Sequence, residues 1–120
     1  MEKSKLTQIA DALPHASREM PFGPEVEVWK IGGKIFAAIG GEPLGLTVKC
    51  DSIETARLLI DLGKAMKAPY FHASWIRVDL AETAQDDAIS RLQESYRLVR
   101  GALPKWQRTQ LDDQPAPEIE

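Results

Sequence analysis

The chain has 120 residues, 43% of them hydrophobic, and its 15 basic and 18 acidic side chains leave a net charge of −3. This length and apolar content suit a single domain with a continuous core, and the acidic balance lacks the overall basic signature of a nucleic-acid-binding protein. The lone cysteine, Cys50, excludes an intramolecular disulfide, and no spacing of Cys and His residues fits a zinc site.

The first predicted element is a short helix that ends at Pro14, because the apolar residues before this proline recur at helical spacing. These residues are Leu6, Ile9, Ala10 and Leu13. Residues 15–24 contain two prolines and Gly23, so we expect a loop there.

Next comes a β-hairpin, with strands over residues 25–31 and 34–39 joined by Gly32 and Gly33, which supply the positive φ of a two-residue turn. The turn predicts a register in which Trp29 faces Phe36 and Val28 faces Ala37. Alternation then predicts two faces. The core face holds Val26, Val28, Ile35, Ala37 and Ile39, with Lys30 at its end, and the opposite face holds Glu27, Trp29, Ile31, Lys34, Phe36 and Ala38.

A third strand is predicted over residues 44–50, followed by a helix that Asp51 caps and that continues to about Ala68. Residues 75–80 alternate as a late strand, with residues 70–72 as part of a short hairpin before it. Thr83 then caps a last helix that ends at Pro104. The predicted fold class is α+β: an antiparallel sheet, made of a meander over residues 25–50 and late strands within residues 70–80, packed with three helices in the order α-β-β-β-α-β-α.

The C-terminal end is acidic and contains prolines. Four of the 18 acids lie in residues 112–120, so residues 1–111 carry a net charge of +1. We therefore expect one domain over residues 1–108 and a disordered tail over residues 109–120. Residues 1–13 lack the apolar core of a signal peptide, and no run approaches the roughly 18 apolar residues of a membrane span. These features predict a cytoplasmic protein without a membrane partner.

Several segments together resemble the MmcQ/YjbR family. They are residues 20–25 (MPFGPE), 28–37 (VWKIGGKIFA), 46–51 (LTVKCD), 69–70 (PY) with 75–80 (WIRVDL), and 95–99 (SYRLV) with 103–105 (LPK). The resemblance implies a compact α+β fold, described for the family as CyaY-like or double-winged, and a DNA-binding role assigned by fold analogy. Many members carry a basic loop of the His-x-Asn-Lys kind before the tryptophan, whereas residues 71–74 here read FHAS.

The candidate binding surface is the non-core face of the predicted sheet, where aromatic and cationic side chains would lie together. Its residues are Trp29, Lys34, Phe36, Lys49, Trp75 and Arg77. Such a surface suits nucleic acid, because rings stack on unpaired bases at roughly 1 to 3 kcal/mol each and cations neutralise phosphates. It also suits a protein partner, a homodimer contact or a small-ligand pocket. In a further alternative the rings are buried and the lysines only solvate the rim.

A second basic cluster lies near the end of the last predicted helix: Arg97, Arg100, Lys105 and Arg108. Cations at this position also complement the helix macrodipole without any ligand. Catalytic groups are not recognisable, because His15 and His72 lack partners at metal-ligand or triad spacing and Cys50 alternates onto the core side of its strand. The sequence therefore predicts a non-enzymatic binding module without cofactor or metal, with DNA as the partner that the resemblance implies.

Overall fold

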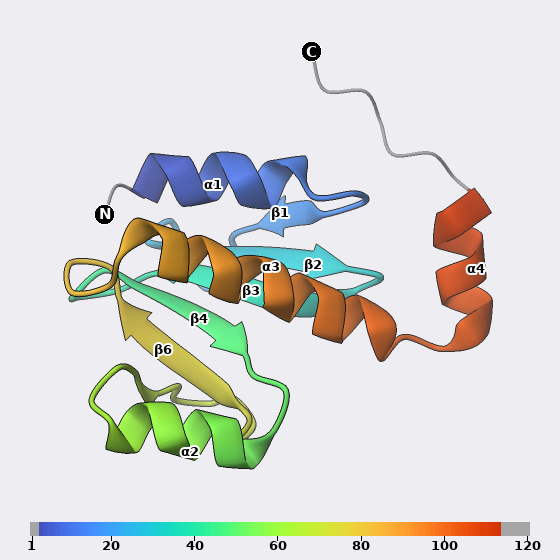
Figure 1. Cartoon of the computed structure of the whole chain (residues 1–120). Helices are drawn as coiled ribbons and strands as arrows, with labels where there is room; N and C mark the ends of the chain where they lie inside the picture. The colour runs from blue at the N-terminus through green and yellow to red at the C-terminus, as the bar shows by residue number, and fades with distance from the viewer. Residues whose placement is uncertain (1–2, 114–120) are drawn as a thin grey trace.

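The computed structural model describes residues 3–113 and contains one six-stranded antiparallel sheet with four helices (Figure 1). The strands are β1 (Ser17–Glu19), β2 (Val26–Ile31), β3 (Lys34–Gly40), β4 (Gly45–Lys49), β5 (Met66–Lys67) and β6 (Trp75–Asp79), in the spatial order β1-β2-β3-β4-β6-β5. The helices are α1 (Lys3–Ala12), α2 (Ile53–Asp61), α3 (Gln85–Gly101) and α4 (Lys105–Asp113).

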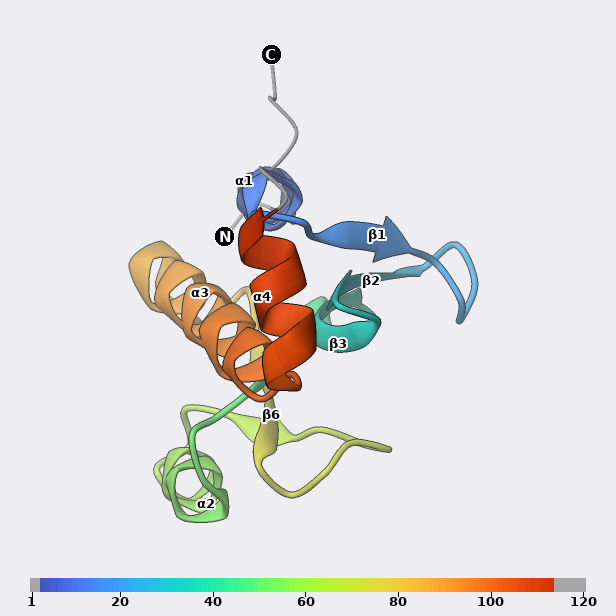
Figure 2. The same ribbon diagram turned by 90° about the vertical axis from the view of Figure 1, so that its right-hand side faces the viewer.

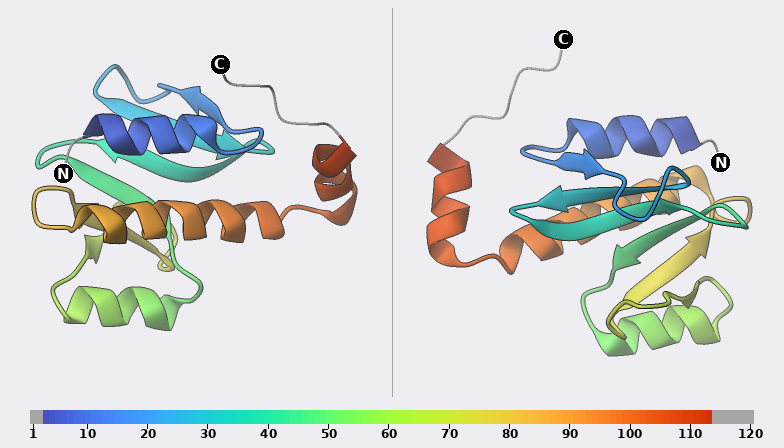
Figure 3. Two further views of the ribbon diagram at one scale, coloured as in Figure 1. Left: turned by 45° about the horizontal axis from the view of Figure 1, so that its top comes forward. Right: turned by 180° about the vertical axis from the view of Figure 1, so that it is seen from behind.

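The helices α1 and α3 cover the same face of the sheet. In the view turned by 90°, α1 and α3 lie to the left of β1, β2 and β3 (Figure 2). Seen from behind, the strands β2, β3 and β4 lie in front of α3 (Figure 3). The core lies between these layers. It contains Leu6 and Ala10 of α1, the inward side chains of the central strands, and Ala88, Leu92, Tyr96 and Val99 of α3.

The predicted α+β class and the antiparallel sheet are confirmed, but three elements were missed. The strand β1 lies within the predicted loop, where its three exposed polar residues pair with β2 and show no apolar alternation. The two-residue β5 replaces the end of the second predicted helix, which stops at Asp61, and pairs with β6 in place of residues 70–72. The fourth helix, α4, extends past residue 108 to Asp113, so the prediction of disorder is wrong for residues 109–113. Residues 114–120 of the predicted tail lie outside the described part.

Two predicted helix caps also differ. Ser52, not Asp51, caps α2, and its side chain accepts a hydrogen bond from the Thr55 backbone N–H at 3.0 Å. The helix α3 begins after Ala84 without a side-chain cap, because the Thr83 hydroxyl donates instead to the Asp79 carbonyl at 2.7 Å. The Ser52 hydroxyl therefore sets the start of α2 one residue later than predicted, and the Thr83 hydroxyl stabilises the loop before α3 without capping that helix.

The predicted core face of the hairpin is wrong, and a β-bulge also moves residues of β3 from one face to the other. Near the turn the register is as expected, with Lys30 opposite Ile35, but Trp29 then pairs with Ala37, which leaves Phe36 as the extra residue of β3. A one-residue shift moves side chains to the other face. Trp29, Ile31 and Phe36 share a face, as predicted, but this face lies beneath the helices and the three side chains are fully buried; the bulge brings Ala37 and Ile39 onto the same face. Val28 and Ala38, which are paired, lie on the opposite face.

Within residues 3–113, no helix combines the length and the apolar character needed to cross a membrane.

Candidate functional site

A fork in the sheet creates the candidate site. The pairing of β3 with β4 runs from Gly40 opposite Gly45 to Ala37 opposite Val48 and ends at the bulge. Beyond this point the β2–β3 hairpin diverges from the strands β4 and β6, and the C-terminal half of α3 passes between the two arms (Figure 1).

A single buried hydroxyl holds the fork at its apex. Ser95 of α3 is fully buried, and its hydroxyl donates to the Phe36 carbonyl at 2.6 Å while it accepts the Lys49 backbone N–H at 2.9 Å. These are the two backbone groups at which the ladder stops. Ser95 therefore satisfies the groups that the bulge leaves without strand partners.

The space between the arms, which we call the fork groove, has a volume of about 530 Å³. One arm contributes Lys30, Gly33, Lys34 and Ile35, the other contributes Lys49, Phe71 and Trp75, and the end of α3 with the following loop contributes Val99, Ala102, Leu103 and Pro104. Three of these side chains are lysines, and none of the described residues that line the groove is acidic. The groove thus combines a positive charge with an apolar wall.

The arm formed by β4 and β6 presents an ordered aromatic and cationic pair. Lys49 lies directly opposite Trp75 in the strand register, and the rings of Phe71 and Trp75 have centroids 4.7 Å apart at an interplanar angle of 38°. The Lys49 ammonium donates to the Ser74 hydroxyl at 3.2 Å, and this hydroxyl also lies 2.8 Å from His72 Nδ1. Ser74 thereby fixes the position of the ammonium group.

The six side chains predicted to share one surface are divided by the fold. Lys34, Lys49 and Trp75 line the fork groove, whereas Trp29 and Phe36 are fully buried. The prediction of an exposed face is wrong for these two rings, because the face that they share is the one that α1 and α3 cover. Phe36 instead contacts the ring of Tyr96 edge-on at 5.2 Å.

The sixth residue, Arg77, lies on the sheet face but stabilises a turn. Its guanidinium donates to the backbone carbonyls of Gly40, at 2.9 Å, and of Pro43. It packs so closely over the turn that a Cβ added to Gly45 would lie 2.4 Å from the guanidinium carbon. Arg77 therefore clamps the β3–β4 connection, away from the fork groove.

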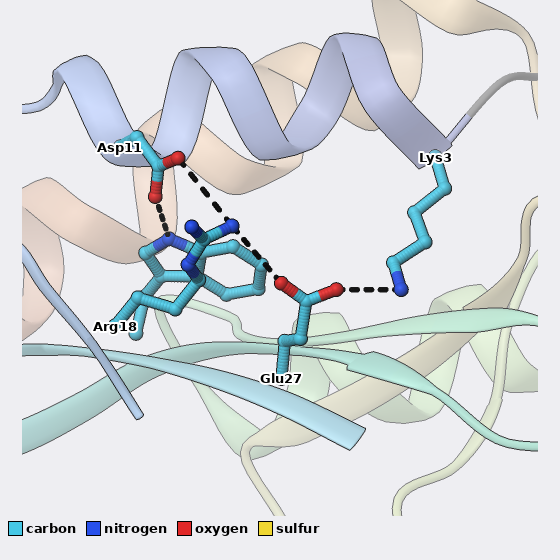
Figure 4. Close-up of polar contacts among 5 residues, drawn as sticks. Lys3, Asp11, Arg18 and Glu27 are labelled. Atoms are coloured by element: carbon cyan, nitrogen blue, oxygen red, sulfur yellow. Dashed lines mark hydrogen bonds and ion pairs between the residues drawn. The ribbon is translucent and has the colours of Figure 1, made fainter. Parts of the chain in front are cut away.

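The buried Trp29 is tied to a polar cluster beneath α1 (Figure 4). Its indole N–H donates to Asp11 at 2.9 Å, Arg18 lies between Asp11 and Glu27, and the Lys3 ammonium lies 2.5 Å from the Glu27 carboxylate. The hydrogen bond from Lys3 lowers the pKa of Glu27, burial opposes this shift, and the charges of Lys3 and Arg18 add to it. The cluster fastens α1 to the sheet and uses the polar atom of Trp29.

The second predicted basic cluster is partly engaged within the chain. Arg100 pairs with Asp112 of α4, and Arg108 donates to the Leu103 carbonyl at 3.0 Å. Arg97 and Lys105 are exposed. The pairings of Arg100 and Arg108 give those two side chains a role in holding α4.

Among the charged and aromatic residues of the groove, two were missed from the sequence. Lys30 was placed on the core face, although it lines the groove and pairs with Glu19 of β1 at 2.9 Å. Phe71 precedes Trp75 by four residues in a loop, so strand alternation could not assign it to a face. The only signal for Phe71 in the sequence is its position four residues before Trp75. Its place in the groove depends on the fork, which begins at the bulge and is not visible in the sequence.

Comparison with known proteins assigns the family. The sequence model of the YjbR family matches residues 11–98, which is most of the chain. The chain belongs to the YjbR family. The matched region includes every lysine and aromatic residue of the fork groove and ends just before its apolar wall at Val99.

Among solved structures, the YjbR domain is similar to the crystal structure of the Deinococcus radiodurans protein DR2400, described as a DUF419 domain. The TM-score is 0.80 and the sequence identity 25%, over 96% of this chain and 91% of that chain. No curated protein matches the chain significantly. The similarity extends over nearly the full length of both chains, so the two proteins share a fold.

Proposed function

We propose that this YjbR domain is a non-enzymatic module that binds DNA in the fork groove. The observation that carries the proposal is the convergence of Lys30, Lys34 and Lys49 on a groove whose described lining has no carboxylate. Lysine ammonium groups neutralise phosphates, and the release of counterions from the nucleic acid then favours binding. A local basic patch of this kind functions even in a chain with a net negative charge.

The three lysines differ in how available they are to a phosphate. Lys34 is exposed at the tip of the hairpin, and Lys49 is oriented by Ser74, so both have donors for a ligand. Lys30 is already paired with Glu19. We therefore assign the main phosphate contacts to Lys34 and Lys49 and a weaker contribution to Lys30.

The nucleophiles near the groove support a binding role over catalysis. Cys50 is fully buried, and burial raises the pKa of its thiol, which disfavours the reactive thiolate. Ser74 is 5% exposed, and its hydroxyl already contacts Lys49 and His72. We place this module in the cytoplasm, the compartment that the single unpaired cysteine favours.

The test is the binding of short fluorescein-labelled DNA, single-stranded and duplex, measured by fluorescence anisotropy. We expect binding at low salt with an affinity that falls steeply as salt rises, because phosphate contacts release counterions. The double variant Lys34→Glu/Lys49→Glu should weaken binding by at least about tenfold. The control is Lys5→Glu, which makes the charge reversal of one of these two substitutions at an exposed position of α1.

Three results would contradict the proposal. They are the absence of binding to either DNA at low salt, an affinity that does not depend on salt, and an equal loss of affinity in Lys5→Glu and the double variant. Salt-independent binding of a protein or an uncharged small molecule would instead favour the apolar wall as the principal contact.

A further inference from the structure

We infer that the fork groove takes single-stranded DNA, with one unpaired base stacked on the Phe71 and Trp75 rings. This inference rests on the proposed function and specifies which form of DNA is the ligand. Both rings are partly exposed at the groove, and their mutual contact limits the orientations that each can adopt. Base stacking on such aromatic side chains is the principal way in which proteins hold unpaired nucleotides without reading their sequence.

The two walls of the groove match the two halves of a nucleotide. The wall formed by the end of α3 consists of Val99, Ala102, Leu103 and Pro104, which offer apolar contact to a base. The carboxyl end of a helix carries a partial negative charge, which disfavours a phosphate on this side. The phosphates are therefore placed on the lysine side of the groove, and the base lies toward the apolar wall.

The strand register sets a base and a phosphate next to each other. Because Lys49 is directly opposite Trp75 across the β4–β6 pair, a base stacked on Trp75 has its sugar-phosphate within reach of the Lys49 ammonium. Lys34, on the other arm of the fork, is then available to an adjacent phosphate. The positions of Lys49 and Lys34 on opposite arms thus suit a DNA strand that crosses the groove from one arm to the other.

A duplex does not fit this arrangement. The faces of paired bases are covered by their neighbours in the stack, so a base reaches a ring inside a concave site only when it is flipped out at an energetic cost. The groove volume of about 530 Å³ falls in the range of roughly 300 to 1,000 Å³ that is typical of sites for one small molecule. Duplex DNA is consequently restricted to backbone contacts with the lysines at the rim.

The experiment compares one labelled strand with the same strand annealed to its complement, at low salt and equal concentration. We expect the single strand to bind about tenfold more tightly, which corresponds to the stacking of one base. Phe71→Leu and Trp75→Leu should each reduce single-strand affinity by about this factor and leave duplex affinity unchanged. The control Trp106→Leu removes a tryptophan that is 68% exposed on α4 and should change neither.

A second measurement leaves the groove unmutated. In a Trp106→Phe background the remaining tryptophans are the buried Trp29 and the groove residue Trp75. Addition of single-stranded DNA should quench the emission of Trp75, because the base covers the indole, whereas duplex DNA should not.

The possible outcomes separate the two proposals. Equal or tighter binding of the duplex, or binding of the single strand without quenching, overturns the stacking inference and leaves DNA binding in place. A failure of both DNA forms to bind overturns both. Circular dichroism of each variant identifies any that fails to fold, and the quenching result then decides the stacking inference.

Discussion

The hydroxyl of Ser95 joins α3 to the backbone of Phe36 at the bulge, and the same oxygen receives the N–H of Lys49. One side chain thus satisfies a donor and an acceptor from two strands that have ceased to pair with each other. The bulge, the fork and the groove all meet at this contact. Because Ser95 has no exposed surface, water has little access to replace it.

We therefore expect Ser95→Ala to destabilise the domain by about 2 to 4 kcal/mol, since it leaves two buried backbone groups unsatisfied. Urea denaturation monitored by circular dichroism measures the free energy of unfolding. Ser90→Ala removes an exposed hydroxyl from the same helix and should change stability by less than about 0.5 kcal/mol. Equal stabilities of the two variants would show that the Ser95 contact is not important for the fork.

Arg77 provides a contrast between a turn clamp and a ligand contact. Arg77→Met retains much of the apolar side chain but removes the hydrogen bonds to the carbonyls of Gly40 and Pro43. We expect a loss of about 1.5 to 3 kcal/mol in the free energy of unfolding, typical of hydrogen bonds from a charged group. DNA affinity, measured by anisotropy at a temperature where the variant remains folded, should stay within about twofold of wild type. A large loss of affinity without loss of stability would instead place Arg77 in the binding surface.

Apolar periodicity in the sequence was sufficient to predict the central elements of the fold. It located β2, β3, β4, β6, α1 and α3, and it placed Lys49 and Trp75 on a common face, as the structure has them. It failed for β1 because an exposed polar edge strand leaves no apolar pattern. It failed for α4 because this helix is held by distant contacts, such as the hydrogen bond from Gln107 to Gly32.

The error that mattered for the site was the choice of the core face of the hairpin. A two-residue glycine turn fixes the pairing only as far as the ladder remains regular, and β2 and β3 carry apolar residues on both faces. Alternation therefore does not show which face the helices cover, and it does not distinguish the regular register from the one with a bulge at Trp29 and Lys30. As a result, Trp29 and Phe36, which were predicted to be exposed, are buried, and Lys30, which was predicted at the end of the core face, lines the groove.

The attachment of α4 to the hairpin turn leads to a further prediction. Gly32 has φ +58°, and a Cβ there would lie 2.7 Å from both Leu103 Cδ1 and Gln107 Nε2, whereas a Cβ at Gly33, with φ +81°, would meet nothing within 4 Å. Both Gly→Ala substitutions carry the left-handed backbone cost of about 1 to 2 kcal/mol. The free energy of unfolding of Gly32→Ala should be about 1 kcal/mol lower than that of Gly33→Ala, because Gly32→Ala also breaks the hydrogen bond from Gln107.

Limited proteolysis distinguishes the cause of this difference. If the added methyl group releases α4, the segment after Pro104 should be cleaved faster in Gly32→Ala than in Gly33→Ala under conditions where both are folded. Identical cleavage rates and equal stabilities would indicate that α4 does not depend on the turn.

The cluster beneath α1 predicts how stability depends on acid. The pKa of Glu27 is held below its ordinary value of 4.5, mainly by the hydrogen bond from Lys3, and the carboxylate side chain is only 14% exposed. Because the folded state favours the ionised form, this contribution to stability is present above pH 4.5 and is lost as the pH falls through the folded pKa. Urea midpoints measured from about pH 6 to pH 3 should fall less steeply for Glu27→Gln than for wild type. Lys3→Met removes the largest cause of the lowered Glu27 pKa but leaves Arg18, so the pH dependence of its urea midpoint should lie between those of wild type and Glu27→Gln. Adding Lys3→Met to Glu27→Gln should not change the pH dependence further. A Glu27→Gln slope equal to that of wild type would show that other carboxylates dominate the acid sensitivity of the fold.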